Sequence, residues 1–248
     1  MIDLHIHILP GVDDGSSSME ESLRMAAIAA DCGVREMAVT PHCNLPEPAR
    51  PLLSGEVRKH MQNFQAVLDQ TGIPIRLYPG MEIFGKPDTA ALLRRGDLLT
   101  LADSRYPLIE FPFHRYGEEA TEVLGNVLDL GLRPLVAHPE RYRYVQQDPR
   151  LVNLWADMGC LLQINRGSLL GRFGEQTEAM AFALLERNFV TCIASDAHRS
   201  SFRTPMLKDV YALVSEEMSP ETAEQLMHRN PEVILHNQEI RNTEPDWF

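Results

Sequence analysis

Short apolar runs that alternate with helix-like stretches constrain the fold of this chain more than any other sequence feature. Most of the runs are nearly continuous in apolar and β-branched residues, as is typical of parallel strands buried on both faces. Seven strands are predicted, at Ile2–Ile8, Glu36–Thr40, Ile75–Tyr78, Leu108–Phe111, Pro134–Ala137, Leu161–Ile164 and Val190–Ala194. This alternation over 248 residues predicts an α/β protein.

Signals for helix starts and stops support the alternation. Ser18 followed by Glu21 is a capping-box pattern, and Gly33 ends the helix that it opens. Further helices are predicted at Glu118–Leu130, at Gln176–Arg187 and from Ser219–Pro220–Glu221 onward. Seven strand–helix units favour a (β/α) barrel that forms one domain, 1–248. An open doubly wound sheet stays as the alternative, although no glycine-rich nucleotide loop follows any predicted strand.

Charge and apolar content argue against several classes of protein. Acidic residues outnumber basic ones 35 to 23, and a net charge of −12 does not suit a surface that wraps nucleic acid. No apolar run reaches the roughly 18 residues of a membrane helix. The first ten residues lack the basic region and cleavage site of a secretory signal. The four cysteines are scattered, so we expect a cytoplasmic protein with reduced thiols and no membrane insertion.

Side chains that can bind a metal ion follow nearly every predicted strand. In chain order they are His5, His7, Asp13, Asp14, His42, Glu82, Glu110, His138, Asn165, Asp196 and His198. The carboxyl ends of barrel strands converge on one face, where active sites are built. We therefore expect these side chains to form one site.

Each motif is weak alone, but the set indicates metal binding. The spacing of His5 and His7 places both imidazoles on one side of a strand, and an aspartate such as Asp196 is also common as a helix cap. Glu110 is more informative, because a carboxylate within the apolar string LIEFP is costly to bury unless it is paired or metal-bound. Carboxylates mixed with imidazoles suit manganese, iron or zinc, and carboxylate-bridged ions are typical of phosphoester hydrolysis.

Two segments do not fit the alternation. The proline-rich stretch Asn44–Gly55 is predicted to be a mobile loop over one end of the barrel. The tail Asn242–Phe248 ends in the aromatic pair Trp247–Phe248, which either packs on the chain's own surface or forms a subunit contact. The oligomeric state is therefore left open.

Seven strings of residues resemble the PHP (polymerase and histidinol phosphatase) superfamily. They are HIHILPGVDDG at 5–15, TPH at 40–42, GMEIF at 80–84, LIEFP at 108–112, AHPERY at 137–142, LQINRGSLLGRFG at 162–174 and ASDAH at 194–198. The longer strings resemble the branch of bacterial manganese-dependent protein-tyrosine phosphatases of capsule and exopolysaccharide synthesis. The similarity covers essentially the whole chain.

The resemblance implies a distorted seven-stranded (β/α) barrel that holds three divalent ions, with Mn²⁺ expected and iron or zinc as alternatives. One ion would bind His5, His7, Glu82 and Asp196. A second would share Glu82 and add Glu110 and His138. The third would bind Asp14, His42 and His198, with Asp13 as an alternative to Asp14.

The resemblance also implies the reaction and its further residues. Arg141 would bind the phosphate, and Arg203 would either add a second contact or form a surface ion pair. A hydroxide that bridges two metal ions would attack phosphorus, and His42 or His198 would assist the leaving tyrosyl oxygen through water. The expected substrate is a phosphotyrosine protein, namely a bacterial tyrosine kinase of polysaccharide export. The alternatives are a phosphoesterase for a small phosphomonoester such as histidinol phosphate, and a barrel that binds ligands without catalysis.

Overall fold

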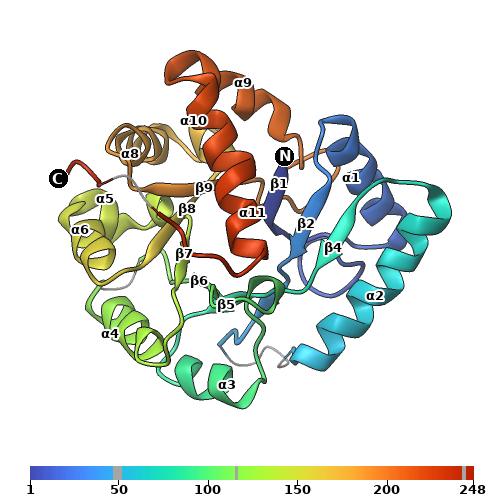
Figure 1. Cartoon of the computed structure of the whole chain (residues 1–248), viewed down its shortest axis with the longest axis horizontal. Helices are drawn as coiled ribbons and strands as arrows, with labels where there is room; N and C mark the ends of the chain where they lie inside the picture. The colour runs from blue at the N-terminus through green and yellow to red at the C-terminus, as the bar shows by residue number, and fades with distance from the viewer. Residues whose placement is uncertain (47–51, 115–116, 242–243) are drawn as a thin grey trace.

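The computed structural model describes residues 1–46, 52–114, 117–241 and 244–248, with strands in the middle and helices around them (Figure 1). The strands are β1 (Ile2–Ile6), β2 (Glu36–Val39), β3 (His42–Cys43), β4 (Arg76–Tyr78), β5 (Glu82–Phe84), β6 (Leu108–Glu110), β7 (Leu135–Ala137), β8 (Leu161–Asn165) and β9 (Val190–Ala194). The α-helices are α1 (Met19–Asp31), α2 (Ser54–Thr71), α3 (Thr89–Arg95), α4 (Gly117–Leu128), α5 (Arg143–Gln147), α6 (Arg150–Asp157), α7 (Arg166–Leu169), α8 (Glu175–Glu186), α9 (Leu207–Glu217), α10 (Pro220–Glu224) and α11 (Asn230–Leu235). The short helices are η1 (Leu101–Asp103), η2 (Pro139–Arg141) and the π-helical η3 (Gln225–Arg229).

The strands of the described residues form two parallel sheets, which confirms the predicted α/β class. One sheet has the order β1-β2-β4, and the other has the order β3-β5-β6-β7-β8-β9. The sheets meet where β1 lies beside the chain that leaves β9. There Ile6 forms a parallel bridge with Ala197, and the amide of Asp196 donates to the carbonyl of His5 at 2.8 Å. A continuous ring of strands is not seen in the described part of the chain.

Two of the predicted strands, Glu36–Thr40 and Ile75–Tyr78, are each followed by a further short strand, so the described chain has nine strands where the sequence predicted seven. Pro41 separates β2 from β3, and Pro79 with Gly80 separates β4 from β5. Proline has no amide hydrogen to donate to a neighbouring strand, so pairing stops at both places. After the breaks, β3 and β5 pair with each other, and His42 lies opposite Glu82.

The predicted helix starts are confirmed. The Ser18 side chain accepts a hydrogen bond from the amide of Glu21, and Ser219 accepts one from the amide of Thr222. Helix α2 begins at Ser54, within the stretch 44–55 that was predicted to be a loop, and residues 47–51 of that stretch lie outside the described residues. No helix in the described ranges has the length and apolar character needed to cross a membrane.

The core has two parts. The larger apolar cluster joins the strands to the surrounding helices, with Phe64, Trp155 and Val210 among its buried members. The smaller one packs side chains of β1, β2 and β6 to β9 against Ile234 and Leu235 of α11, the red helix in front of the strands in Figure 1.

The C-terminal aromatic pair packs on the chain's own surface. The Phe248 ring stacks on Phe189 with centroids 5.4 Å apart, and the Arg187 guanidinium lies 4.8 Å from its centre. Trp247 keeps 49% of its surface exposed. Of the two predicted alternatives, packing on the chain's own surface is therefore the one observed. Residues 242–243 of the tail lie outside the described residues.

Candidate metal centre

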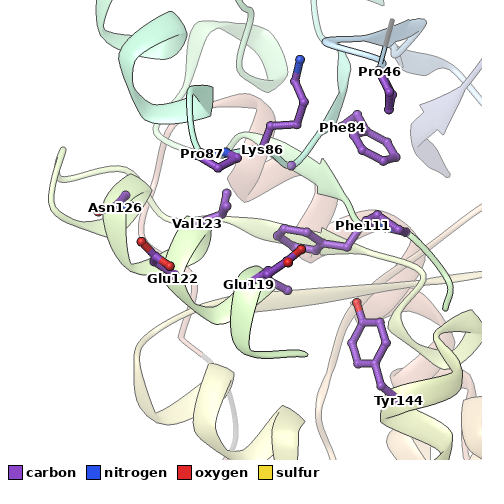
Figure 2. A pocket seen from close by; sticks show the side chains of 13 residues that line it. Pro46, Phe84, Lys86, Pro87, Phe111, Glu119, Glu122, Val123, Asn126 and Tyr144 are labelled. Atoms are coloured by element: carbon purple, nitrogen blue, oxygen red, sulfur yellow. The ribbon is translucent and has the colours of Figure 1, made fainter. Parts of the chain in front are cut away.

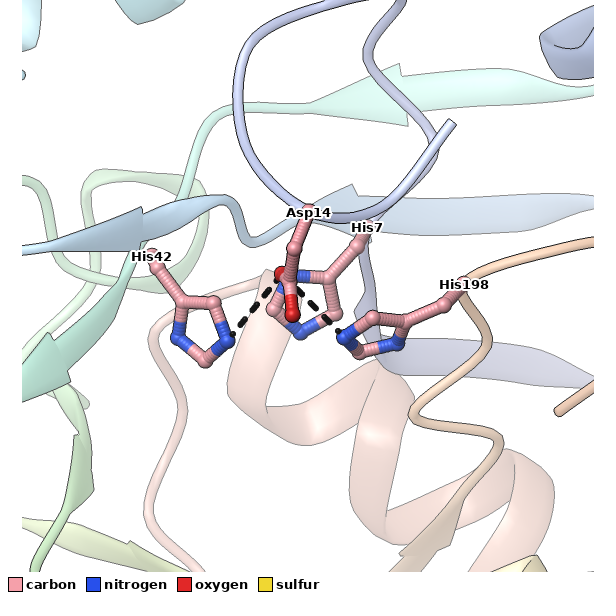
Figure 3. Close-up of side chains that lie close together, drawn as sticks. All are labelled: His7, Asp14, His42 and His198. Atoms are coloured by element: carbon pink, nitrogen blue, oxygen red, sulfur yellow. Dashed lines mark ion pairs between the residues drawn. The ribbon is translucent and has the colours of Figure 1, made fainter. Parts of the chain in front are cut away.

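The ends of the strands bring all nine predicted ligands into one cluster. The cluster contains four groups of side chains, and within each group the ligand atoms all lie within 4.8 Å of one another. These groups are His7, Asp14, His42 and His198; His5, His7 and Asp196; His5, Glu82 and His138; and His42, Glu82 and Glu110. Figure 3 shows the first group, with Asp14 3.5 Å from both His42 and His198. The residues predicted to gather at one face of the fold do so.

Glu82 lies at the centre of the cluster, and only 1% of its surface is exposed. Its Oε1 lies 2.9 Å from Nε2 of His138 and 3.2 Å from Nε2 of His5. Its Oε2 lies 2.8 Å from Nδ1 of His42 and 3.3 Å from Nε2 of His7. Burial opposes its charge, but His5 and His42 outweigh burial and hold the pKa of Glu82 well below its usual range. Four imidazoles therefore surround one ionised carboxylate.

Three of the imidazoles are oriented by an oxygen acceptor at Nδ1. His5 Nδ1 lies 2.9 Å from Oε1 of Gln163, and His7 Nδ1 lies 2.7 Å from Oδ2 of Asp13. His198 Nδ1 lies 3.1 Å from the backbone carbonyl of Asp196. Since these oxygens accept, the proton sits on Nδ1 and the lone pair of Nε2 faces the cluster. Such a partner behind the ring is a usual feature of histidines that bind metal ions.

The contacts within the cluster fit a cation better than they fit the side chains alone. Nε2 of His5 and Nε2 of His7 are only 3.3 Å apart, and two lone pairs at that distance repel each other unless a proton or a metal ion lies between them. Nε2 of His198 is buried and has no hydrogen-bond partner in the described structure. Burial and the nearby charge of Glu82 also raise the pKa of Glu110 to about 8, which a cation would reverse. The donor set therefore fits divalent metal ions.

The two neighbouring aspartates take different positions. Asp13 holds the His7 ring and also accepts hydrogen bonds from the amides of Gly15 at 2.9 Å and His42 at 3.0 Å. Asp14 faces His42 and His198 instead, and the latter lowers its pKa far below the usual range. The arrangement favours Asp14 as the ligand and gives Asp13 the role of orienting His7.

Two candidate ligands adopt backbone angles that are unfavourable for residues other than glycine. His138 has φ of 35° and directly follows β7, and Asp196 has φ of 48° and lies two residues after the end of β9. Strained conformations of this kind cluster at functional sites, where surrounding contacts hold them. At both positions the chain turns away from the direction of the strand, and the side chain of the turning residue lies in the ligand cluster.

The two predicted phosphate-binding arginines converge beside the cluster. Arg141, in η2, lies 3.3 Å from Oδ2 of Asp196, and Arg203 lies 2.5 Å from the same oxygen. Nε of Arg203 is buried and has no hydrogen-bond partner among the described residues. Arg203 forms an ion pair, as the alternative for this residue expected, but its partner is the buried Asp196 and not a surface carboxylate.

Sequence reasoning missed most of the polar network behind the ligands. Gln163, which contacts His5, donates to Oδ1 of Asn165 at 2.8 Å, and Asn165 donates to Oδ2 of Asp196 at 2.6 Å. Asn165, which was predicted among the side chains that can bind a metal ion, is thus hydrogen-bonded to the candidate ligand Asp196. Both side chains come from β8 and belong to the string 162–174, whose length and polarity inside a buried strand were the available signal.

A large cavity lies apart from these ligands. It has a volume of about 670 Å³ and lies between the ends of β5 and β6 and helix α4, with Phe84, Phe111 and Tyr144 around it (Figure 2). None of the nine candidate ligands lines it. Hydrolytic chemistry is therefore assigned to the histidine–carboxylate cluster and not to the cavity.

The cysteines do not form a nucleophilic site. Cys160 precedes Arg166 by the spacing Cys-x5-Arg found in thiol phosphatases, but an extended strand separates the two and Arg166 pairs with Asp209. Burial raises the pKa of Cys160 to about 12. Burial, and then the charge of Glu82, raise the pKa of Cys43 well above its usual value. Neither thiol is poised to ionise near neutral pH.

Comparison with known proteins agrees with this site. A family model described as "Capsular polysaccharide synthesis, CpsB/CapC" matches residues 1–236. The chain is 34% identical to tyrosine-protein phosphatase YwqE of Bacillus subtilis (strain 168), over 99% of this chain and 95% of that protein. It is also 34% identical to tyrosine-protein phosphatase CpsB of Streptococcus pneumoniae, over 97% of this chain and the full length of that protein.

A solved structure is similar over the whole chain. It comes from the work on YwqE from Bacillus subtilis and CpsB from Streptococcus pneumoniae, described as unique metal-dependent tyrosine phosphatases. The TM-score is 0.94 at 33% identity, with 100% of this chain and 99% of the other covered. The resemblance stated from the sequence is confirmed, and the chain belongs to the CpsB/CapC family of capsular polysaccharide synthesis.

Proposed function

We propose that this protein is a metal-dependent tyrosine phosphatase that hydrolyses phosphotyrosine on a protein of capsule or exopolysaccharide synthesis. The observation that carries the proposal is the convergence of nine imidazole and carboxylate ligands beside Arg141 and Arg203. The names of the similar proteins support the same activity. The proposed partner is the phosphotyrosine-bearing tail of a bacterial tyrosine kinase.

Three divalent metal ions, with Mn²⁺ preferred over iron or zinc, are the proposed cofactors. One would be held by His5, His7, Glu82 and Asp196, the second by Glu82, Glu110 and His138, and the third by Asp14, His42 and His198, and close contacts between members of each set support this division. The absence of a thiolate among these ligands and the high share of carboxylate oxygen favour Mn²⁺. When bound, the metal ions supply Lewis acidity, which polarises phosphoryl oxygens and lowers the pKa of water.

The chain itself supplies binding and orientation for the phosphoryl group. The Arg141 guanidinium presents a planar fork of N–H donors to phosphoryl oxygens that face away from the ligand cluster. Arg203, which contacts the same Oδ2 of Asp196 as Arg141 does, adds a second donor. In the reaction, a bond from water oxygen to phosphorus replaces the bond from the tyrosyl oxygen, and inorganic phosphate leaves.

His42 and His198 complete the proposed catalytic set. They flank Asp14 at the rim of the cluster, where a proton can pass through water to the tyrosyl oxygen (Figure 3). Burial opposes the charge of His42, but Glu82 outweighs burial and raises its pKa to about 9. A bound cation would reverse this shift, so His42 and His198 are alternative routes for the proton. A phenol, with a pKa of about 10, leaves with little help, and loss of either histidine should act mainly through the metal site.

A substrate panel tests the proposal. The manganese-loaded protein should hydrolyse a phosphotyrosine peptide faster than histidinol phosphate and other small phosphomonoesters. Faster turnover of histidinol phosphate would identify a small-molecule phosphoesterase instead. No metal-dependent release of phosphate from any substrate would indicate a barrel that binds without catalysis.

The proposed architecture is one domain, 1–248, built as a distorted seven-stranded barrel of PHP type in the cytoplasm. Counting β2 with β3 and β4 with β5 as interrupted strands gives seven positions around the ring. The bridge from Ile6 to Ala197 and the hydrogen bond from the His7 amide to the Ala197 carbonyl at 3.0 Å support closure between β1 and β9.

Glu110→Gln should lower activity while the fold survives. The amide keeps the shape of the side chain but removes a ligand charge, so the loss should exceed the roughly 10- to 100-fold that removal of an outer-shell partner costs. Without metal, the variant should be at least as stable as the wild type, because the charge that burial and Glu82 disfavour is gone. Turnover, metal content and Tm are the measurements, with the exposed Glu122→Gln on α4 as control. Unfolding of the variant with no change in bound metal would assign Glu110 a structural role.

Replacing all four cysteines by serine or alanine should leave turnover within a few fold of wild type. Cys43, Cys160 and Cys192 are buried, and burial raises the pKa of each thiol. None of the three is therefore expected to be a thiolate near neutral pH. The same insensitivity is expected toward thiol-alkylating reagents. A complete loss in a folded, metal-loaded variant, traced to one cysteine, would point to a thiol nucleophile.

A further inference from the structure

We propose that Phe173 is a positioning residue that holds Arg141 and Arg203 ready for the phosphoryl group, a role that rests on the proposed function. The centre of its ring lies 4.3 Å from Cζ of Arg141 and 5.9 Å from Cζ of Arg203. Both distances are within the range of cation–π attraction. One aromatic side chain therefore contacts both guanidinium groups.

The convergence of the two arginines creates an electrostatic problem that an aromatic ring can solve. Both guanidinium groups approach the same Oδ2 of Asp196, which also accepts a hydrogen bond from Asn165. Two positive groups so close to each other repel, and this single carboxylate oxygen is already shared. The face of the Phe173 ring attracts cations but accepts no conventional hydrogen bond, so it stabilises the arginines without occupying their N–H donors. A carboxylate in the place of the ring would compete with phosphate for the N–H donors of the two arginines.

The two arginines depend on the ring to different extents. Arg141 is sandwiched, because the ring of Phe113 lies 4.6 Å from its Cζ on a second side. Arg203, in contrast, contacts one aromatic ring among the described residues, that of Phe173. Its buried Nε has no hydrogen-bond partner there, so the ring and Asp196 define its orientation.

The string 162–174 builds the support for Phe173. Ser168 donates to Oε1 of Glu140 at 2.6 Å, which ties α7 to the residue next to Arg141. Gly167 lets the ring pack closely, because a Cβ atom at that position would lie 2.8 Å from Cε2 of Phe173. A stretch of sequence that contributes none of the nine candidate metal ligands thus acquires a role in phosphate binding.

The first test compares Phe173→Leu with Phe173→Tyr in the manganese-loaded, full-length protein. Leucine keeps the apolar volume and loses the ring, so kcat/KM for a phosphotyrosine peptide should fall about tenfold, the size expected for two partly exposed cation–π contacts. The inhibition constant of inorganic phosphate should rise by a similar factor, and metal content should stay unchanged. Tyrosine keeps the ring and should retain wild-type values within about twofold. Phe202→Leu is the control, since Phe202 neighbours Arg203 in sequence but is 71% exposed.

The second test asks whether Phe173 acts through the arginines. In an Arg141→Ala, Arg203→Ala background, adding Phe173→Leu should change kcat/KM by less than about twofold, because coupled residues are not additive. Gly167→Ala, which displaces the ring without altering it, should weaken phosphate inhibition in the wild-type background. Gly55→Ala, where an added Cβ meets no atom within 4 Å, is its control.

The outcomes separate this inference from the proposed function. A wild-type protein that releases no phosphate with manganese would overturn the function itself. An active wild type with a Phe173→Leu variant of unchanged kcat/KM and phosphate inhibition would overturn only the role of Phe173. An equal loss of activity with and without the arginines, or a loss that follows metal content, would show that Phe173 acts through the general structure of the site.

Discussion

Exhaustive removal of divalent metal should abolish the hydrolysis of phosphotyrosine by this protein, and Mn²⁺ should restore it best. The ligand cluster holds five histidines and four carboxylates and no thiolate, a set that suits Mn²⁺. Chelation followed by titration with Mn²⁺, Fe²⁺, Zn²⁺ and Mg²⁺ is the measurement, with phosphate release as the readout. Full activity that persists after metal analysis finds no bound ion would refute the proposed mechanism.

The same titration should stabilise the fold. Metal removal leaves Nε2 of His5 and Nε2 of His7 facing each other at 3.3 Å, and it leaves Glu110 beside Glu82 without a compensating cation. A ligand that binds only the native state adds about 2.7 kcal/mol at a concentration of 100 times its Kd. The Tm of the metal-free protein should therefore rise as Mn²⁺ is added. A Glu82→Gln variant should lose most of this rise, because Glu82 contacts four imidazoles of the cluster.

Arg141→Ala should lower kcat by about 30- to 1,000-fold, which corresponds to about 2–4 kcal/mol of transition-state stabilisation. Negative charge on the phosphoryl oxygens changes most in the transition state, so the loss should appear in kcat more than in KM. Arg141→Lys keeps the charge but not the planar fork, and only part of the activity should return. Steady-state kinetics with metal content measured alongside will check this prediction.

The matched control for Arg141 is Arg143→Ala. Arg143 is an exposed arginine two residues further on, at the start of α5, and its loss should leave kcat unchanged. Near-wild-type turnover of a metal-loaded Arg141→Ala variant would make Arg141 a structural residue. The phosphate contact would then be sought first at Arg203.

The α/β class and the gathering of the candidate ligands could be predicted because both depend on local patterns. The apolar runs mark buried parallel strands, and the candidate ligands lie within or just past the ends of strands, as Glu110 lies at the end of β6 and His138 directly after β7. The two strands missed, β3 and β5, are two and three residues long and follow prolines, so a window of apolar residues does not reveal them.

The residues that orient the ligands could not be predicted in the same way. Gln163 lies 158 positions from the His5 ring that it fixes, and Phe173 lies 32 and 30 positions from Arg141 and Arg203. A glutamine inside a buried strand signals a polar network but not its partner, and a phenylalanine between Arg172 and Gly174 has no local chemistry that distinguishes it. Their roles arise from proximity that only the folded chain provides.

The junction between the first strand and the segment after the last has a consequence for biosynthesis. The amide of Asp196 donates to the carbonyl of His5, so the ion-binding side chains at the start of the chain meet those near residue 198 only after nearly all of the polypeptide has left the ribosome. At about 5–20 residues per second, roughly 10 to 40 s separate the appearance of His5 from that of His198. During that time the nascent chain exposes loose histidines and carboxylates rather than a formed coordination sphere. Metal capture at this site is therefore expected to be a late event that coincides with closure of the fold.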